Sequence, residues 1–140
     1  MPAFIWTSIG GGGMAEKLLE QLKLWLSTYP EWDDFCLLPK SWEEISQNTD
    51  LVGNKLIEQR CYVNLYWQMP SLGDEAQNAC RLLDFQNWVR EQCVLSQIPR
   101  LGDVAALDRV LTEKGGFTMG SQMVAYTITL VVDFAKTYKV

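Results

Sequence analysis

The chain contains no histidine, no closely spaced pair of cysteines and no long apolar run. Without histidine it lacks the side chain that most often performs acid–base chemistry near neutral pH, and Ser–His and Cys–His triads are excluded. No two cysteines are closer than Cys80 and Cys93, so neither a C-x-x-C motif nor a mixed Cys/His zinc site is present. No apolar stretch approaches the about 18 residues that a membrane span requires, so we expect a soluble intracellular protein.

Basic residues are also few: 12 Lys and Arg stand against 17 Asp and Glu, which gives a net charge of −5. The cations are scattered along the chain, whereas a nucleic-acid backbone requires a basic surface. Direct sequence-specific binding of nucleic acid is therefore not expected. For the cysteines we expect small, buried, reduced side chains that bind no metal: Cys36, Cys61, Cys80 and Cys93.

Two segments, residues 60–69 and 123–134, alternate apolar and polar side chains with the period of two that is typical of half-buried strands. In the first segment the apolar set is Cys61, Val63, Leu65, Trp67 and Met69, and the polar set is Tyr62, Asn64, Tyr66 and Gln68. Such a sheet has one apolar face for helices to cover. Its second face, rich in Tyr, Thr and Asn, would meet solvent or another subunit.

Two segments have helical spacing. Residues 14–28 place Leu18, Leu22 and Trp25 on one side, and Tyr29-Pro30 ends the helix. Residues 74–96 form a second helix that begins at Asp74, and Pro99 follows it. The apolar positions predicted for this second helix are Ala76, Ala79, Cys80, Leu83, Phe85, Trp88, Val89 and Cys93.

The remaining segments give weaker signals. Residues 35–38 predict an edge strand that ends at Pro39, and residues 41–53 predict a short helical turn followed by a loop. Residues 107–114 read as a strand, followed by a turn or bulge at Gly115-Gly116. The order of elements predicts an α+β domain in which two helices cover one face of an antiparallel sheet of about four strands.

The domain is expected to span residues 14–140 and to follow a flexible arm, residues 1–13, which ends in four glycines. Met14 is a plausible alternative start. The glycines do not form a phosphate-binding loop, because no Gly-Lys-Ser/Thr sequence follows them. The neighbouring carboxylates Asp33-Asp34 and Glu43-Glu44 point in different directions and are interpreted as solvated charges. We therefore expect no catalytic residue, no metal and no cofactor.

The chain has six tryptophans. The spacing of Trp25, Trp67 and Trp88 with other apolar residues indicates core positions. The others lie in the arm and the loops, where exposed aromatic residues typically mark protein interfaces. Together with two tyrosines of the polar strand face, they form the predicted interface: Trp6, Trp32, Trp42, Tyr62 and Tyr66.

The order of three segments resembles that of a known protein family. These segments are residues 85–92 with the pattern F-x-x-W-V, residues 98–102 with the sequence Ile-Pro-Arg-Leu-Gly, and the last strand, residues 126–134. The family comprises the small minor capsid or tail-completion proteins of tailed bacteriophages and Gram-positive prophages. The resemblance covers about residues 18–134 and includes the first amphipathic helix and a strand that ends near a proline. The arm before Met14 is not part of the family pattern.

The resemblance implies a tail-terminator-like fold and a non-enzymatic tail terminator or head–tail joining subunit. Such a subunit forms a ring, hexameric in expectation, that caps the tail tube and contacts the head connector protein. Its partners would be copies of itself, the tail-tube protein and the connector, within the virion and, during assembly, in the host cytoplasm. The alternative is a small intracellular ligand-binding or accessory domain with a pocket lined by Trp and Tyr. An enzyme that uses carboxylates alone is a third, weaker interpretation.

Overall fold

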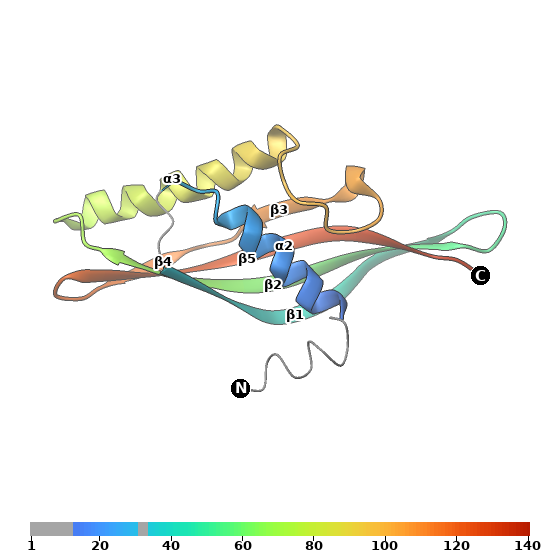
Figure 1. Cartoon of the computed structure of the whole chain (residues 1–140), viewed down its shortest axis with the longest axis horizontal. Helices are drawn as coiled ribbons and strands as arrows, with labels where there is room; N and C mark the ends of the chain where they lie inside the picture. The colour runs from blue at the N-terminus through green and yellow to red at the C-terminus, as the bar shows by residue number, and fades with distance from the viewer. Residues whose placement is uncertain (1–12, 31–33) are drawn as a thin grey trace.

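The computed structural model describes residues 13–30 and 34–140. Helices α2 (Met14–Leu26) and α3 (Glu75–Val94) lie over the same face of one antiparallel sheet (Figure 1). The strands follow the spatial order β1-β2-β5-β3, and β4 also pairs with β5. Their bounds are β1 (Asp34–Thr49), β2 (Lys55–Pro70), β3 (Arg109–Thr112), β4 (Gly116–Met119) and β5 (Met123–Tyr138), with a short 3-10 helix, η1 (Ala105–Leu107), before β3. The α+β class and the covering of one sheet face by two helices agree with the sequence prediction.

The sheet has five strands but four strand positions, because β3 and β4 lie in series along β5. β3 pairs with residues 130–133 and β4 with residues 124–127 of β5. Between them the register changes by one residue, and the Glu113 N–H donates to the Thr129 carbonyl over 2.8 Å. The bulge predicted at Gly115-Gly116 therefore divides one long strand into two.

The first helix forms as its sequence predicts, and its end is capped by side chains. Leu18, Leu22 and Leu26 recur every four residues and are buried against the sheet. At the C-terminus, the Ser27 and Thr28 hydroxyls donate to backbone carbonyls of the last turn. The same two carbonyls, of Lys23 and Trp25, also accept the backbone N–H groups of Ser27 and Thr28, so each has two donors at the helix end.

The second helix begins at its predicted cap, where the Asp74 carboxylate accepts the Gln77 N–H over 2.8 Å. Its predicted apolar face is partly wrong: Ala76, Cys80 and Leu83 are exposed. The buried face instead contains Asn78, Arg81, Leu82, Phe85 and Val89. The polar Asn78 is buried because three groups bond to it: its side chain binds the Leu72 N–H and the Ser71 hydroxyl, and the Tyr126 hydroxyl donates to its carbonyl. These bonds fix the rotation of α3 and turn Leu83 outward.

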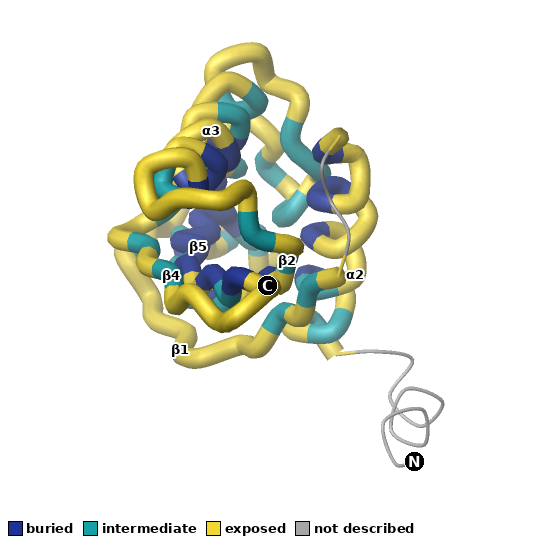
Figure 2. Tube along the Cα trace, turned by 90° about the vertical axis from the view of Figure 1, so that its left-hand side faces the viewer, coloured by how far each residue is buried: buried dark blue, intermediate teal, exposed yellow. Residues whose placement is uncertain are grey.

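Aromatic rings fill the space between the helices and the sheet, and Figure 2 shows the buried residues gathered there. Trp25 of α2 stacks on Trp88 of α3, with ring centroids 5.2 Å apart. Trp67 of β2 contacts Phe85 at 5.4 Å and Tyr126 at 5.0 Å. The prediction that Trp25, Trp67 and Trp88 belong to the core is confirmed, as is the packing of both helices on the face of β2 that contains Trp67.

The helical turn predicted after residue 41 is wrong, because β1 continues to Thr49, and the predicted loop is confined to the hairpin turn at residues 50–53. Bulges between Pro39 and Ser41 and between Glu44 and Ser46 accommodate the irregular sequence. Trp42 anchors the middle of the strand: its indole N–H donates to the Gln59 side chain over 2.6 Å, and its ring lies edge-on to Phe134 at 5.1 Å. The pairing surface of β2, which lies distant in sequence, overrides the local turn signals.

Candidate functional site: an open sheet face and two sheet edges

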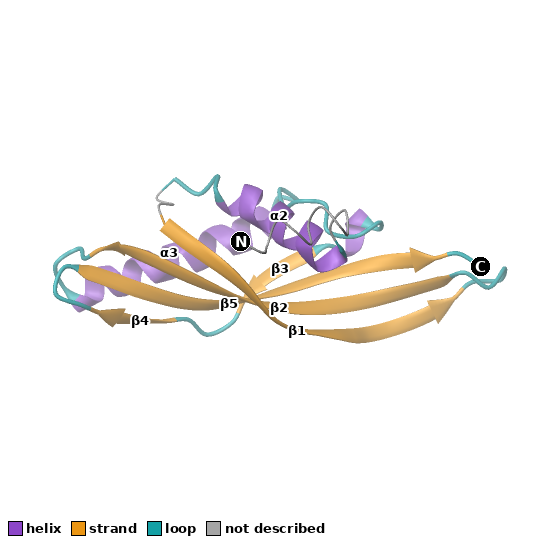
Figure 3. Cartoon of the chain, turned by 60° about the horizontal axis from the view of Figure 1, so that its bottom comes forward, coloured by secondary structure: helices purple, strands orange, loops and turns teal. Residues whose placement is uncertain are grey.

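The sheet face opposite the helices lies in front of them in Figure 3. At its centre this face presents polar side chains. Tyr66 is 39% exposed and Tyr62 is half-buried. The Thr129 hydroxyl donates to Asn64 over 3.1 Å, and the Asn64 amide donates to the Tyr66 hydroxyl over 3.3 Å. Neutral side chains on this part of the face therefore bind one another across neighbouring strands.

Four charged residues form a row across this face, one from each of four neighbouring strands, and we call them the charge row. Glu43 of β1 lies opposite Arg60 of β2, Arg60 opposite Asp133 of β5, and Asp133 opposite Arg109 of β3. Arg60 binds the Asp133 carboxylate with two hydrogen bonds of 2.7 and 3.0 Å, and Arg109 binds it at 2.7 Å. The signs alternate across the sheet, from an acid at the β1 edge to a base at the β3 edge.

Asp133 is only 7% exposed. Burial acts to raise its pKa, but the hydrogen bonds from Arg60 and Arg109 outweigh that effect, so the pKa of Asp133 lies below its ordinary value. The same contact raises the pKa of Arg60. Val131 and Ala135 are buried beside Asp133, so the second sheet face is not open along this part of β5 as the alternation predicts.

The outer edge of β1, here called the β1 edge, forms one border of the sheet. It exposes three large apolar side chains, Leu38 (53%), Trp42 (37%) and Ile45 (44%). Pro39, which has no N–H donor, and the two bulges interrupt the regular spacing of donors and acceptors along it. Such an edge favours contact through side chains over the addition of another strand.

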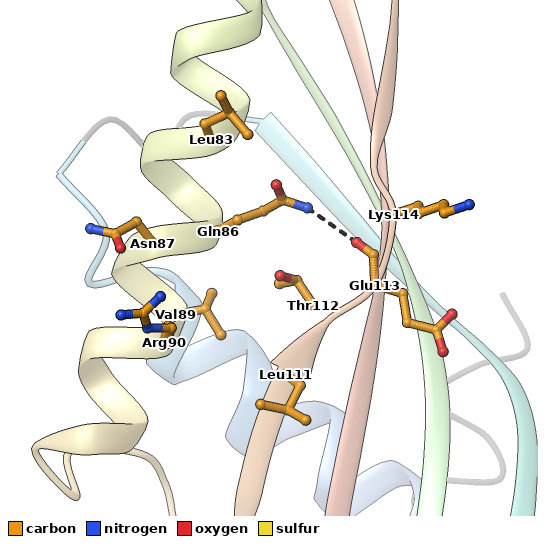
Figure 4. Close-up of a pocket in the computed structure, with 9 residues that line it drawn as sticks. All are labelled: Leu83, Gln86, Asn87, Val89, Arg90, Leu111, Thr112, Glu113 and Lys114. Carbon is orange, nitrogen blue, oxygen red and sulfur yellow. Dashed lines mark hydrogen bonds between the residues drawn. The ribbon is translucent and has the colours of Figure 1, made fainter.

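At the opposite border, α3 covers the edge of β3. The Cys93 thiol contacts both backbone groups of Val110, at 2.9 Å from the carbonyl oxygen and 3.3 Å from the nitrogen. The Gln86 amide donates to the Glu113 carbonyl over 3.1 Å, as Figure 4 shows. These contacts occupy backbone groups that a further strand would need.

A shallow groove of about 490 Å³ runs between α3 and β3, and we call it the α3–β3 groove. Figure 4 draws its lining residues: Leu83, Gln86, Asn87, Val89, Arg90, Leu111, Thr112, Glu113 and Lys114. Leu83 and Leu111 are 60% and 38% exposed. The groove therefore combines exposed apolar side chains with the cations of Arg90 and Lys114.

Besides the β1 edge and the α3–β3 groove, the tip of the β1–β2 hairpin also exposes apolar side chains. Leu51 is fully exposed and Val52 is largely exposed. The Asp50 carboxylate fixes the turn by accepting the N–H groups of Val52 at 3.0 Å and Asn54 at 2.9 Å. The tip thus holds two apolar side chains in solvent at the end of two long strands.

The residues predicted as an interface lie in different places. Tyr62 and Tyr66 share the polar sheet face, whereas Trp42 lies on the helix side of the sheet at the β1 edge. Trp6 and Trp32 lie outside the described residues. The sequence reasoning missed the charge row and the α3–β3 groove, because both depend on strand register and helix rotation. The one available signal was Asp133, the only charged residue between Met123 and Ala135 of β5.

The cysteines divide into two pairs, which corrects the expectation that all four are buried. Cys61 is buried and Cys93 is half-buried, but Cys36 and Cys80 are exposed. Burial raises the pKa of the Cys61 thiol to about 11 and also raises the pKa of Cys93. Among the described residues, no group of three or more His, Cys, Asp or Glu side chains is arranged to hold a metal ion.

We predict that a thiol reagent at neutral pH will modify Cys36 and Cys80 rapidly and Cys61 and Cys93 slowly, because the second pair has low accessibility and little thiolate. Mass spectrometry over time, with a denatured sample as the control for full modification, measures both phases. Rapid modification of Cys61 in the folded protein would contradict its placement in the core.

Comparisons of the chain with protein-family models, curated proteins and solved structures find no match. The helices that the structure describes include none with the length and apolar character needed to span a membrane.

Proposed function

We propose that this protein is a non-enzymatic structural subunit of a tailed bacteriophage or prophage virion. It assembles with copies of itself into a ring of six subunits at the head–tail junction. The ring terminates the tail tube and joins it to the head connector protein. The subunit resides in the host cytoplasm before assembly and requires no cofactor.

The observation that supports this proposal most strongly is the position of the exposed apolar side chains. Exposed apolar side chains occur at two opposite borders of one sheet, with Leu38 and Ile45 at the β1 edge and Leu83 and Leu111 at the α3–β3 groove, in addition to those at the tip of the β1–β2 hairpin. A ring requires two different surfaces on each subunit, so that each copy contacts a neighbour on either side. Two separated surfaces fit this requirement better than one patch, which would favour a symmetric dimer.

The motifs that resemble tail-completion proteins agree with this proposal because they have structural roles here. Phe85 and Trp88 pack in the aromatic core. The Ile-Pro-Arg-Leu-Gly segment turns sharply, and the Asp108 carboxylate fixes the turn by accepting the N–H groups of Leu101 at 2.8 Å and Gly102 at 3.0 Å. A family of assembly subunits would share such packing and turn signals rather than an active site.

The alternative of an aromatic-lined ligand pocket has less support. Trp25, Trp67 and Trp88 pack against other rings and fill the space between helices and sheet. The α3–β3 groove is open at the surface, and no aromatic residue lines it. A site for a small apolar ligand is usually a concave cavity with apolar or aromatic walls.

Light scattering over a concentration series tests the proposal. We expect a mass several times the 16.0 kDa of one chain, and annular particles by electron microscopy. A variant that combines Leu38→Asp and Ile45→Asp should keep its circular dichroism spectrum and remain a monomer, because both side chains are exposed in the isolated subunit. A wild-type protein that stays monomeric at the highest attainable concentration would argue against a ring.

A further inference from the structure

We infer that neighbouring copies meet head to tail, with the β1 edge of one copy seated on the α3–β3 groove of the next. This inference rests on the proposed self-assembly and names the two surfaces that perform it. The occupant of the groove is therefore a second copy of this chain. The two surfaces lie at opposite ends of the strand order β1-β2-β5-β3, so the contact repeats in one direction around the assembly.

The charge row provides the first argument. It begins with the acid Glu43 at the β1 edge and ends with the base Arg109 on β3. Arg109 is bound to Asp133, yet its side chain remains 53% exposed and keeps donors for a second carboxylate. When the β1 edge of one copy approaches β3 of another, Glu43 follows Arg109 and the alternation of signs continues across the contact. Two β1 edges facing each other would instead bring two Glu43 side chains near each other.

The charges around each surface are also complementary. The β1 strand exposes three acids, Asp34, Glu43 and Glu44, and a single base, Lys40. At the opposite border, the α3–β3 groove is lined by the bases Arg90 and Lys114 and the acid Glu113, and the exposed Arg109 lies beside the half-buried acids Glu58 and Asp108. Opposite net charges favour this pairing of surfaces, and like charges disfavour contact of either surface with itself.

Apolar side chains supply the second argument. Leu38 and Ile45 are exposed on β1, and Leu83 and Leu111 lie at the α3–β3 groove. The groove offers about 490 Å³ of open space between these leucines and the neighbouring polar side chains. Contact would remove all four apolar side chains from water, and the charged residues would form the rim that surrounds apolar interface centres.

Both edges disfavour direct pairing of backbones. Pro39 and two bulges interrupt β1, and Cys93 and Gln86 occupy backbone groups on the outer side of β3. Continuous strand addition would produce an open sheet without a defined number of subunits. Contact through side chains permits the rotation between copies that closes a ring.

Charge reversal tests the inference and leaves the ion pairs of Asp133 with Arg60 and Arg109 in place. Glu43→Lys removes the hydrogen bond from the Tyr62 hydroxyl, so the fold of each variant is checked first. The acidic-edge variant combines Glu43→Lys and Glu44→Lys, and the groove variant combines Arg90→Glu and Lys114→Glu. Matched controls reverse exposed charges on α2, with Glu20→Lys for the first variant and Lys23→Glu for the second. Circular dichroism and thermal unfolding of each variant establish that it is folded before its assembly is measured by light scattering.

We expect each of the two variants alone to need at least about tenfold more protein than the wild type to assemble, because like charges then face each other. An equimolar mixture should assemble again, because the reversed edge of the first variant complements the reversed groove of the second, and the unchanged edge of the second complements the unchanged groove of the first. This rescue distinguishes a contact defect from misfolding, since unfolded variants cannot restore each other. The α2 controls should assemble as the wild type does.

The outcomes separate the two proposals. A monomeric wild type contradicts the proposed function itself. If the wild type and both charge-reversal variants assemble equally well, the proposed ring stands, but the proposed contact between the β1 edge and the α3–β3 groove is overturned. Loss of assembly in the acidic-edge variant alone, with no effect of the groove variant, also overturns it and indicates that the β1 edge contacts a surface other than the α3–β3 groove. Equal loss in the α2 controls would show a general effect of charge and overturn it as well.

Discussion

Replacement of Trp67 by alanine is expected to lower the free energy of unfolding by about 3–5 kcal/mol, the range typical of large aromatic side chains removed from a core. Trp67 is 1% exposed and contacts rings from three other segments: Phe85 of α3, Tyr126 of β5 and Tyr29, which follows α2. The truncation therefore loses burial of the indole and leaves a cavity where helices and sheet meet.

Chemical denaturation monitored by circular dichroism measures this effect. Trp42→Ala serves as the matched control, because Trp42 is 37% exposed and lies at the β1 edge. We expect a smaller loss in this control, arising from the contact with Phe134 and the hydrogen bond to Gln59. Equal stability of the Trp67→Ala variant and the wild type would show that this aromatic cluster is not the core.

Replacement of Asp133 by asparagine is expected to destabilise the fold by about 2–4 kcal/mol at neutral pH. Removal of one member of a buried ion pair costs about 3–5 kcal/mol, and the estimate is lower here because solvent screens the partly exposed arginines. Arg60 and Arg109 retain 29% and 53% side-chain exposure, so both can be hydrated after the change. Arg109→Gln, which removes only the more exposed partner, is the matched control and should cost less.

The effect of Asp133 should depend on pH in one direction. Its pKa in the folded state is lower than its ordinary value of 3.8, so the ionised carboxylate stabilises the fold. This contribution is complete above the pKa of the unfolded state and is lost as the pH falls through the lower folded pKa. The stability difference between wild type and Asp133→Asn should therefore be constant from neutral pH to about pH 5 and decrease below about pH 4. A difference that increases with acidification would contradict the proposed role of the carboxylate.

The sequence predicts those helices and strands in which the spacing of apolar residues matches the face that is buried. Strict alternation around Trp67 and Ile128 identifies β2 and β5, and the spacing of Leu18, Leu22 and Trp25 identifies α2. In each case the apolar residues face a core that the element itself helps to create. The Gly115-Gly116 break is also predictable, because glycine signals a bulge within a strand.

The elements that were missed depend on partners distant in sequence. Residues 41–49 contain turn formers, but β2 offers them an edge to pair with, and Trp42 finds Gln59 and Phe134. The rotation of α3 is set by polar bonds to Asn78, which a hydrophobic pattern does not reveal. Local propensity is overridden in both places by tertiary contacts.

The sequence indicates that the protein has an interface, but it does not locate the surfaces that form it. An excess of aromatic residues outside the periodic positions indicates an interface, and Trp42, Tyr62 and Tyr66 do lie at or near the surface. The charge row needs the register of four strands, which brings Arg60 and Arg109 to Asp133 from sequence distances of 73 and 24 residues. The α3–β3 groove likewise depends on how α3 crosses the sheet border.

Electron microscopy of tail tubes tests the central claim most directly. Tubes polymerised from the purified tail-tube protein of the same genome would be incubated with this protein and imaged. The proposal predicts a ring of copies of this chain on one end of each tube, and tubes that stop elongating there. Bare tube ends, unchanged elongation and a chain that stays monomeric beside the tubes would contradict it.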